Sequence, residues 1–108
     1  MSPNDIINRF PLAMIPTATA NIKKTWQYNI THPCYVVLDH GKCEVHEGNA
    51  DPFDVRFTIS DDNLVALFRG ELSGMAAFMS GKLKVEGDRM FAQRIPSLFN
   101  TDVLLGKV

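Results

Sequence analysis

The sequence predicts an α+β domain built on one five-stranded, mostly antiparallel sheet with helices on one face. Apolar and polar side chains alternate between residues 25 and 59, which is the period of half-buried strands. Segments with helical spacing and capping residues lie before this region and after residue 60. A short alternating segment at 83–85 adds a fifth strand among the later helices. Such elements pack as one sheet with helices segregated to one face.

Length and charge restrict the classes of function. A chain of 108 residues holds one hydrophobic core, so we expect a single domain over 1–108, with its core at about 15–100. A net charge of −1 argues against a nucleic-acid partner, which would need clustered Lys and Arg. No apolar run approaches the roughly 20 residues of a membrane-spanning helix. No signal peptide is visible, and the expected location is cytoplasmic.

The N-terminal segment predicts short helices rather than one long helix. Ser2 can cap a helix, Pro3 suits its first turn, and Asp5 lies at the capping-box distance. Pro11 and Pro16 then interrupt any continuous helix before the first strand.

Four strands follow, and their order along the chain favours an antiparallel meander. Each has apolar residues on one face and mostly polar residues on the other. The residues expected to face inward are Trp26, Tyr28 and Ile30, then Cys34, Val36 and Leu38, then Cys43 and Val45, and finally Val55, Phe57 and Ile59.

The second and third strands form a hairpin whose register the turn determines. A two-residue turn at 40–41 pairs Leu38 with Cys43 and Cys34 with Glu47. The two cysteines then lie roughly 13 Å apart along the strands, beyond the about 7 Å that a disulfide spans. Both are therefore predicted to be buried, unpaired apolar residues.

The second half alternates helices with the last strand. Ser60 is a capping residue, and Gly70 is typical of the position after a helix. A short helix at 74–80, a strand at 83–85 and a helix from about residue 88 complete the domain.

Catalytic and metal-binding patterns are missing from the sequence. His32, His40 and His46 have no second ligand at metal spacing, so no metal or other cofactor is predicted. Strand alternation turns Cys34 and Cys43 inward and His46 outward, which argues against a Cys–His pair. We therefore expect a protein that is not an enzyme.

The later helices carry many large apolar residues. Methionine fills irregular core gaps and also lines adaptable binding surfaces. The residues alone favour core packing and leave a binding surface as the alternative. The residues concerned are Phe68, Met75, Phe78, Met79, Met90, Phe91, Leu98 and Phe99.

Two neighbouring segments resemble the sterol carrier protein type 2 family. In residues 57–72, the motif Thr-Ile-Ser-Asp follows Phe57 and precedes a predicted helix that ends at Gly70. Residues 76–88 contain Ala-Phe-Met-Ser-Gly-Lys-Leu-Lys-Val-Glu-Gly, which is similar to the family's Ala-Phe-x-x-Gly-Lys-Leu-Lys-hydrophobic-x-Gly pattern. The resemblance covers about residues 15–100 and is strongest over 53–95.

This resemblance implies an apolar tunnel, enclosed by the sheet and its helices, that holds fatty-acyl chains, sterols or other lipids without covalent chemistry. Gln93 is expected to make a polar contact at the tunnel mouth. The sheet side of the tunnel would be formed by Val55, Phe57, Leu83 and Val85. The expected lipid-binding residues are Leu64, Phe68, Met75, Phe78, Met79, Met90, Phe91, Ile95, Leu98 and Phe99.

Some positions depart from the family pattern, and other functions stay open. The bulk of Met90 and Phe91 predicts a reduced cavity, which disfavours a sterol ligand. One alternative is an accessory lipid-binding factor that presents a polyprenyl intermediate in quinone biosynthesis. The other is a dimerisation or interaction domain, similar to the C-terminal domains of alkyl sulfatases. The partners considered are a lipid, a transiently contacted membrane, a second copy of the chain and a partner enzyme.

Overall fold

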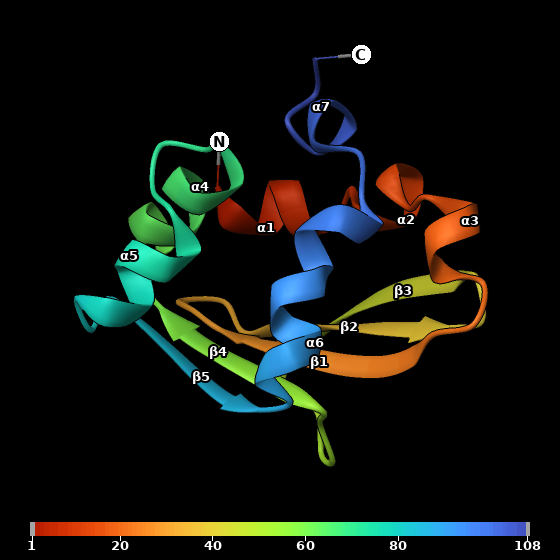
Figure 1. Ribbon diagram of the computed structural model, residues 1–108, viewed down its shortest axis with the longest axis horizontal. Helices are drawn as coiled ribbons and strands as arrows, with labels where there is room; N and C mark the ends of the chain where they lie inside the picture. Colours follow the sequence, from red (N-terminus) through yellow and green to blue (C-terminus); the bar gives the residue numbers. More distant parts are fainter. Residues whose placement is uncertain (1, 108) are drawn as a thin grey trace.

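A computed structural model describes residues 2–107. Its five strands form one sheet in the order β3-β2-β1-β4-β5 (Figure 1). The strands are β1 (Lys23–Asn29), β2 (Cys34–Asp39), β3 (Lys42–Glu47), β4 (Val55–Ile59) and β5 (Leu83–Gly87). The helices are α1 (Pro3–Ile7), α2 (Phe10–Ala13), α3 (Pro16–Thr19), α4 (Asp61–Phe68), α5 (Gly74–Met79), α6 (Arg89–Arg94), the 3-10 turn η1 (Ile95–Leu98) and α7 (Thr101–Leu104). All lie on one side of the sheet, which confirms the predicted α+β class.

The N-terminal helices begin where capping residues and prolines predict. The Ser2 hydroxyl accepts the Asp5 N–H at 3.2 Å, and the Asp5 carboxylate accepts the Ser2 N–H at 3.0 Å. This capping box satisfies two N–H groups that a helix end leaves without partners. Prolines open α1, α2 and α3, and α1 buries Ile6 and Ile7 completely against the rest of the core.

The β2–β3 hairpin has the predicted register. Leu38 pairs with Cys43, and Cys34 pairs with Glu47. His40 and Gly41 both have positive φ angles, 47° and 86°, as a two-residue hairpin turn requires. Both thiols are free, but only Cys34 is buried. Cys43 lies on the edge strand β3 and is half-buried, so the prediction of two buried cysteines is wrong for Cys43. The burial that each thiol has raises its pKa to about 11.

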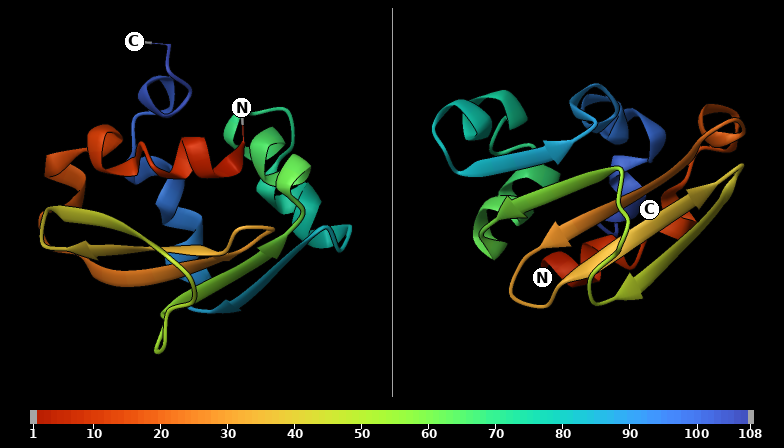
Figure 2. Two further views of the ribbon diagram at one scale, coloured as in Figure 1. Left: turned by 180° about the vertical axis from the view of Figure 1, so that it is seen from behind. Right: turned by 90° about the horizontal axis from the view of Figure 1, so that it is seen from below.

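The predicted antiparallel meander is wrong at β4. This strand pairs in parallel with β1, so that Trp26 lies opposite Val55 and Tyr28 opposite Phe57. The segment 48–54 carries the chain across the outer face of β2 and β1, as the right-hand view of Figure 2 shows. The sheet is therefore mixed, although its other three pairings are antiparallel.

The side chain of Gln27 fixes this crossover. Gln27 projects from the outer face of β1, yet it is only 1% exposed because the segment covers it. Its amide oxygen accepts the Ala50 N–H at 2.6 Å, and its amide nitrogen donates to the Gly48 carbonyl at 3.0 Å. The Asp54 carboxylate adds a further link by accepting the Thr25 N–H at 2.8 Å. These bonds satisfy the backbone of a segment that would otherwise bury polar groups without partners.

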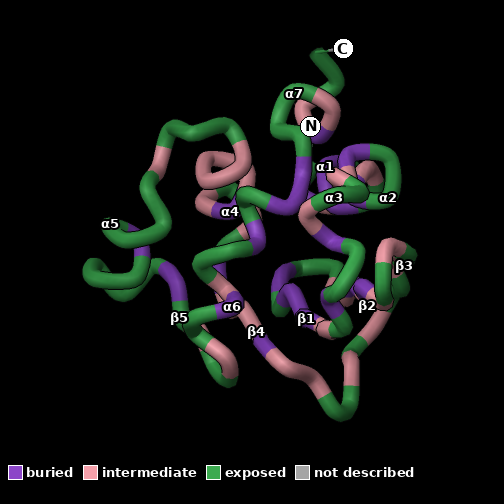
Figure 3. The backbone as a smooth tube through the Cα atoms, turned by 45° about the vertical axis from the view of Figure 1, so that its right-hand side comes forward, coloured by how far each residue is buried: buried purple, intermediate pink, exposed green. Residues whose placement is uncertain are grey.

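The core is an aromatic cluster between the sheet and the helices above β1 and β2. Phe10 stacks on Phe99 with ring centroids 4.5 Å apart, and Trp26 packs against Phe91 at 5.7 Å. Buried positions gather on β1, β2 and the elements over them, whereas α5 is mostly exposed (Figure 3). No helix among residues 2–107 has the length and apolar composition that a membrane crossing requires.

Replacing Gln27 by Ala should lower the free energy of unfolding by about 2–3 kcal/mol. The change removes a fully buried side chain and leaves the partly buried Ala50 N–H and Gly48 carbonyl without their partners. Asn29→Ala is the matched control, because Asn29 lies on the same outer face of β1 but is exposed. It should cost no more than about 0.5 kcal/mol. Urea unfolding measures both values, and equal losses in the two variants would contradict the anchoring role of Gln27.

Candidate functional site

An apolar space lies between the β4–β5 half of the sheet and the helices that cover it. It consists of two adjoining parts, an inner hollow of about 250 Å³ and an outer hollow of about 550 Å³. Both are lined by Phe57, Gly74, Leu83, Ala92 and Pro96, so they meet between the sheet and α6. A continuous tunnel through the domain stays a prediction. Small-molecule sites typically occupy about 300–1,000 Å³. The outer hollow falls in that range, and the inner hollow is slightly smaller.

The inner hollow is lined mostly by large apolar side chains. The Ser60 hydroxyl accepts the Asn63 N–H at 3.2 Å and thereby starts α4. The helical period then turns Leu64, Leu67 and Phe68 toward the hollow. A bond from the Arg9 guanidinium to the Leu104 carbonyl, 3.0 Å long, holds α7 beside it. The other lining residues are Phe10, Tyr28, Leu72, Ile95, Phe99, Thr101 and Leu104.

The outer hollow lies between α5 and α6 and has a different lining. Met75 and Phe78 of α5 form one wall, and Val85 of β5 joins the floor. The opposite wall contains Arg89, Ala92 and Gln93 of α6 and Pro96 of the following turn η1. This hollow therefore has polar groups on one side only.

The capping residue of α6 determines where this helix begins. The Asp88 carboxylate accepts the Phe91 N–H at 3.0 Å and pairs with the Lys24 ammonium at 3.1 Å. The N–H bond, and then the charge of Lys24, hold the pKa of Asp88 below its usual value. The ionised form of Asp88 thus stabilises the start of α6.

Seven of the eleven predicted site residues line the hollows. Leu64, Phe68, Ile95 and Phe99 border the inner hollow, and Met75, Phe78 and Gln93 border the outer one. Of the predicted sheet side, Phe57, Leu83 and Val85 are present, whereas Val55 is completely buried in the core. Whether these residues bind lipid stays a prediction.

The other four predicted residues lie outside both hollows. Met79 and Met90 are 78% and 82% exposed, and Phe91 and Leu98 are buried in the core. The face of α6 that borders the hollow carries Arg89, Ala92 and Gln93. The helical period therefore turns Phe91 toward Trp26 and Met90 toward solvent. The expected reduction of the cavity by Met90 and Phe91 is therefore not seen.

Several lining residues were not expected from the sequence. Ala92 and Pro96 could have been found by following the helical period from Gln93. Leu104 could not, because no periodicity predicted α7. Arg89 shares the face of Gln93 one turn earlier, so the same helical spacing leads to it.

The groups in the hollows are suited to holding an apolar molecule. The Tyr28 hydroxyl accepts the Trp26 indole N–H at 3.1 Å, and burial raises the pKa of Tyr28, so the phenol stays neutral. Within the described part of the chain, no group of three His, Cys, Asp or Glu side chains could hold a metal ion.

Comparison with known proteins agrees with this architecture. Residues 6–100 match the SCP-2 sterol transfer family, and the chain belongs to that family. The chain is 41% identical over 51 residues to the bovine (Bos taurus) hydroxysteroid dehydrogenase-like protein 2, a match that covers 47% of this chain and 12% of that protein. It is 38% identical over 58 residues to a fatty acid-binding protein of Yarrowia lipolytica, a match that covers 51% of this chain and 45% of the relative. The matches thus span less than two thirds of the length of these relatives.

Solved structures share the fold. The apo form of sterol carrier protein 2 from Yarrowia lipolytica is 26% identical, with a TM-score of 0.69 over 94% of this chain and 88% of that one. The sec-alkylsulfatase Pisa1 from Pseudomonas sp. is 15% identical, with a TM-score of 0.78 over 84% of this chain and 15% of that one. The ubiquinone synthesis protein UbiJ-SCP2 is 22% identical, with a TM-score of 0.64 over 95% of this chain and 84% of that one.

The contribution of Asp88 to stability should depend on pH. Since the folded-state pKa is lowered, the stabilisation is fully present above the unfolded value of about 3.9 and is lost as the pH falls through the folded-state pKa. Asp88→Asn keeps a capping oxygen and removes the charge, whereas Asp88→Ala removes both. At pH 7 we expect urea midpoints in the order wild type, Asn variant, Ala variant. The gap between wild type and the Asn variant should begin to narrow below about pH 4 and close once the pH lies below the folded-state pKa. A gap that stays constant down to pH 2.5 would contradict this assignment.

Proposed function

We propose that this domain binds a lipid by its hydrocarbon chain and carries it without a covalent step. The observation that carries the proposal is the pair of adjoining apolar hollows between α4, α5, α6 and the β4–β5 half of the sheet. Membership in the SCP-2 sterol transfer family supports it. So does the name of the Yarrowia lipolytica relative, a fatty acid-binding protein.

Transfer of the chain from water into the hollows supplies the binding energy. Each buried CH₂ contributes about 0.8 kcal/mol. About ten buried methylenes would supply roughly 8 kcal/mol. Because ordering costs subtract from this energy, about micromolar is the tightest binding that these methylenes alone would give. The walls present little polar surface that would have to be desolvated, since most lining side chains are hydrocarbon.

A polyprenyl ligand is the second candidate. The likeness of the fold to a ubiquinone synthesis protein favours testing it. An isoprenoid chain would use the same apolar walls, so only the identity of the bound molecule separates the two candidates. A dimerisation domain without a lipid would instead give a stable oligomer and no extractable ligand.

Native mass spectrometry of the freshly purified protein should show a mass excess that organic extraction removes. Ala92→Leu should lose most of this excess, because Ala92 lines both hollows and the larger side chain fills their junction. Ala76→Leu makes the same change at an exposed position of α5 that borders neither hollow, and it should retain the ligand.

The extracted molecule distinguishes the candidates. An acyl lipid supports the first proposal and an isoprenoid supports the second. If the protein carries no ligand and binds no added fatty acid or isoprenoid, the lipid-binding proposal fails.

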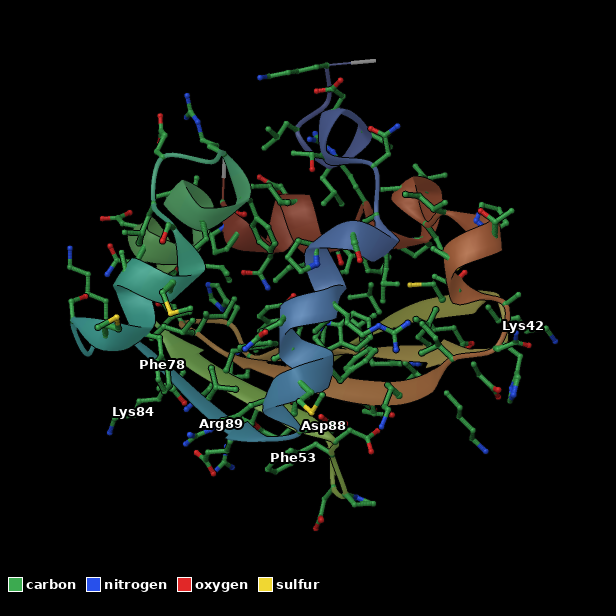
Figure 4. The ribbon with its side chains drawn as sticks, viewed as in Figure 1. Lys42, Phe53, Phe78, Lys84, Asp88 and Arg89 are labelled. Carbon is green, nitrogen blue, oxygen red and sulfur yellow. The ribbon has the colours of Figure 1, made fainter. Side chains whose placement is uncertain are left out.

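We further propose that the domain takes up its ligand in transient contact with an anionic membrane. Met75, Met79 and Met90 are 66%, 78% and 82% exposed on the two helices that flank the outer hollow. Arg89 is exposed on α6 next to Met90, and its guanidinium carbon lies 5.4 Å from the ring centroid of Phe78 on α5 (Figure 4). Apolar side chains with cationic neighbours suit the surface of an anionic bilayer.

Sedimentation with vesicles containing phosphatidylglycerol tests this contact. Met79→Ser combined with Met90→Ser should lower the bound fraction several-fold, because two apolar groups no longer enter the interface. Leu12→Ser is the matched control, since Leu12 on α2 is 80% exposed but borders neither hollow. Equal binding by the double variant and the wild type would contradict the proposal.

A further inference from the structure

The outer hollow carries its polar groups along one edge of α6. Arg89 and Gln93 are four residues apart, so they lie one above the other on the same face of the helix. The remaining lining side chains are mostly hydrocarbon and include Phe57, Phe78 and Leu83. The hollow therefore combines an apolar interior with a cationic and amide-bearing edge.

The charge of Arg89 is not neutralised by the described residues. The ion pairs found within residues 2–107 do not include it. The acidic residues near the start of α6 have other partners, since Asp88 binds Lys24 and Glu86 binds Arg56 at 2.6 Å. Arg89 is thus available to a negative group that enters from outside.

The aromatic ring of Phe78 holds the guanidinium at the edge of the hollow. The Arg89 guanidinium carbon lies 5.4 Å from the centroid of the Phe78 ring, and Figure 4 shows both residues beside the space between α5 and α6. Contact with an aromatic face positions a guanidinium while its N–H groups stay available. A planar guanidinium binds a carboxylate or phosphate through two parallel hydrogen bonds.

The free energy of placing an ionised group also differs between the two hollows. In the inner hollow it would lie among Phe10, Phe68 and Phe99, where desolvation of an unpaired charge is unfavourable. At Arg89, which is exposed, it keeps part of its hydration and gains a charged partner. The polarity of the lining therefore orients a single-chain amphiphile with its tail inward and its charged end outward.

From this arrangement we propose that Arg89, assisted by Gln93, recognises the anionic head group of the bound lipid and so selects ionised single-chain lipids over neutral ones. This inference rests on the proposed lipid binding and adds the class of ligand and its orientation. The nearest chemical probe is a free fatty acid, whose carboxylate is ionised at neutral pH.

The test compares myristate with methyl myristate, which have the same acyl chain and differ in charge. Affinities are measured by displacement of a fluorescent fatty acid at low salt, below the concentration at which micelles form. Wild type should bind the acid about tenfold more tightly than the ester, the size of effect that a charge-assisted hydrogen bond gives. Arg89→Gln should remove that preference while the affinity for the ester changes less than about twofold.

Arg94→Gln is the matched control. It removes the same charge from the same helix, but Arg94 is exposed and borders neither hollow. This variant should keep the preference for the acid, which shows that local geometry rather than overall charge selects the head group. Added NaCl should weaken the preference of the wild type, because an exposed pair is screened.

Three results would overturn the inference. Wild type could bind acid and ester equally, Arg89→Gln could keep the preference, or both arginine variants could lose it alike. In each of these cases the ester still binds, so the proposed lipid binding stands. If neither ligand binds the wild type, the proposed function itself fails and this inference fails with it.

Discussion

The two hydrogen bonds between the Gln27 amide and the segment 48–50 are the constraint on which the arrangement depends. They hold the chain across the outer face of the sheet, so that β4 joins β1 in parallel instead of continuing from β3. This pairing places β4 and β5 at the edge of the sheet opposite the β2–β3 hairpin. Those two strands supply the floor of both hollows.

The stabilising core lies apart from the outer hollow, although Phe10 and Phe99 of the core also border the inner one. The aromatic cluster of Phe10, Trp26 and Phe99 fills the region above β1 and β2, where burial contributes most of the driving force for folding. The helix α5, by contrast, buries only Ala77. The cover of the outer hollow thus contributes little to the stability of the core, which is typical of segments that border binding sites.

The sequence was most informative where local rules decide the structure. The turn at 40–41 determines the register of the hairpin, and Ser60 and Asp88 determine where α4 and α6 begin. The parallel pairing of β4 was missed because it depends on one buried carboxamide, and periodicity places Gln27 on the polar face without showing what covers it.

The site was predicted only in part for a related reason. The sequence predicts a lining of mostly large apolar residues. The helical period of α6, however, turns Phe91 into the core and Met90 toward solvent. The small residue Ala92 and the charged Arg89 occupy the positions that border the outer hollow. The helical spacing of four residues leads from Gln93 to Arg89 and from Pro96 to Ala92, whereas a search for large apolar side chains finds neither.

Methyl NMR during a titration with myristate tests the central claim most directly. The claim predicts that the methyl signals of Leu64, Leu67 and Leu104, which line the inner hollow, shift in proportion to ligand bound. Those of Ile7 and Val36, which are completely buried and border neither hollow, should change little. Shifts confined to the exposed methionines, with the inner leucines unchanged, would contradict the binding of a lipid chain between the sheet and its helices.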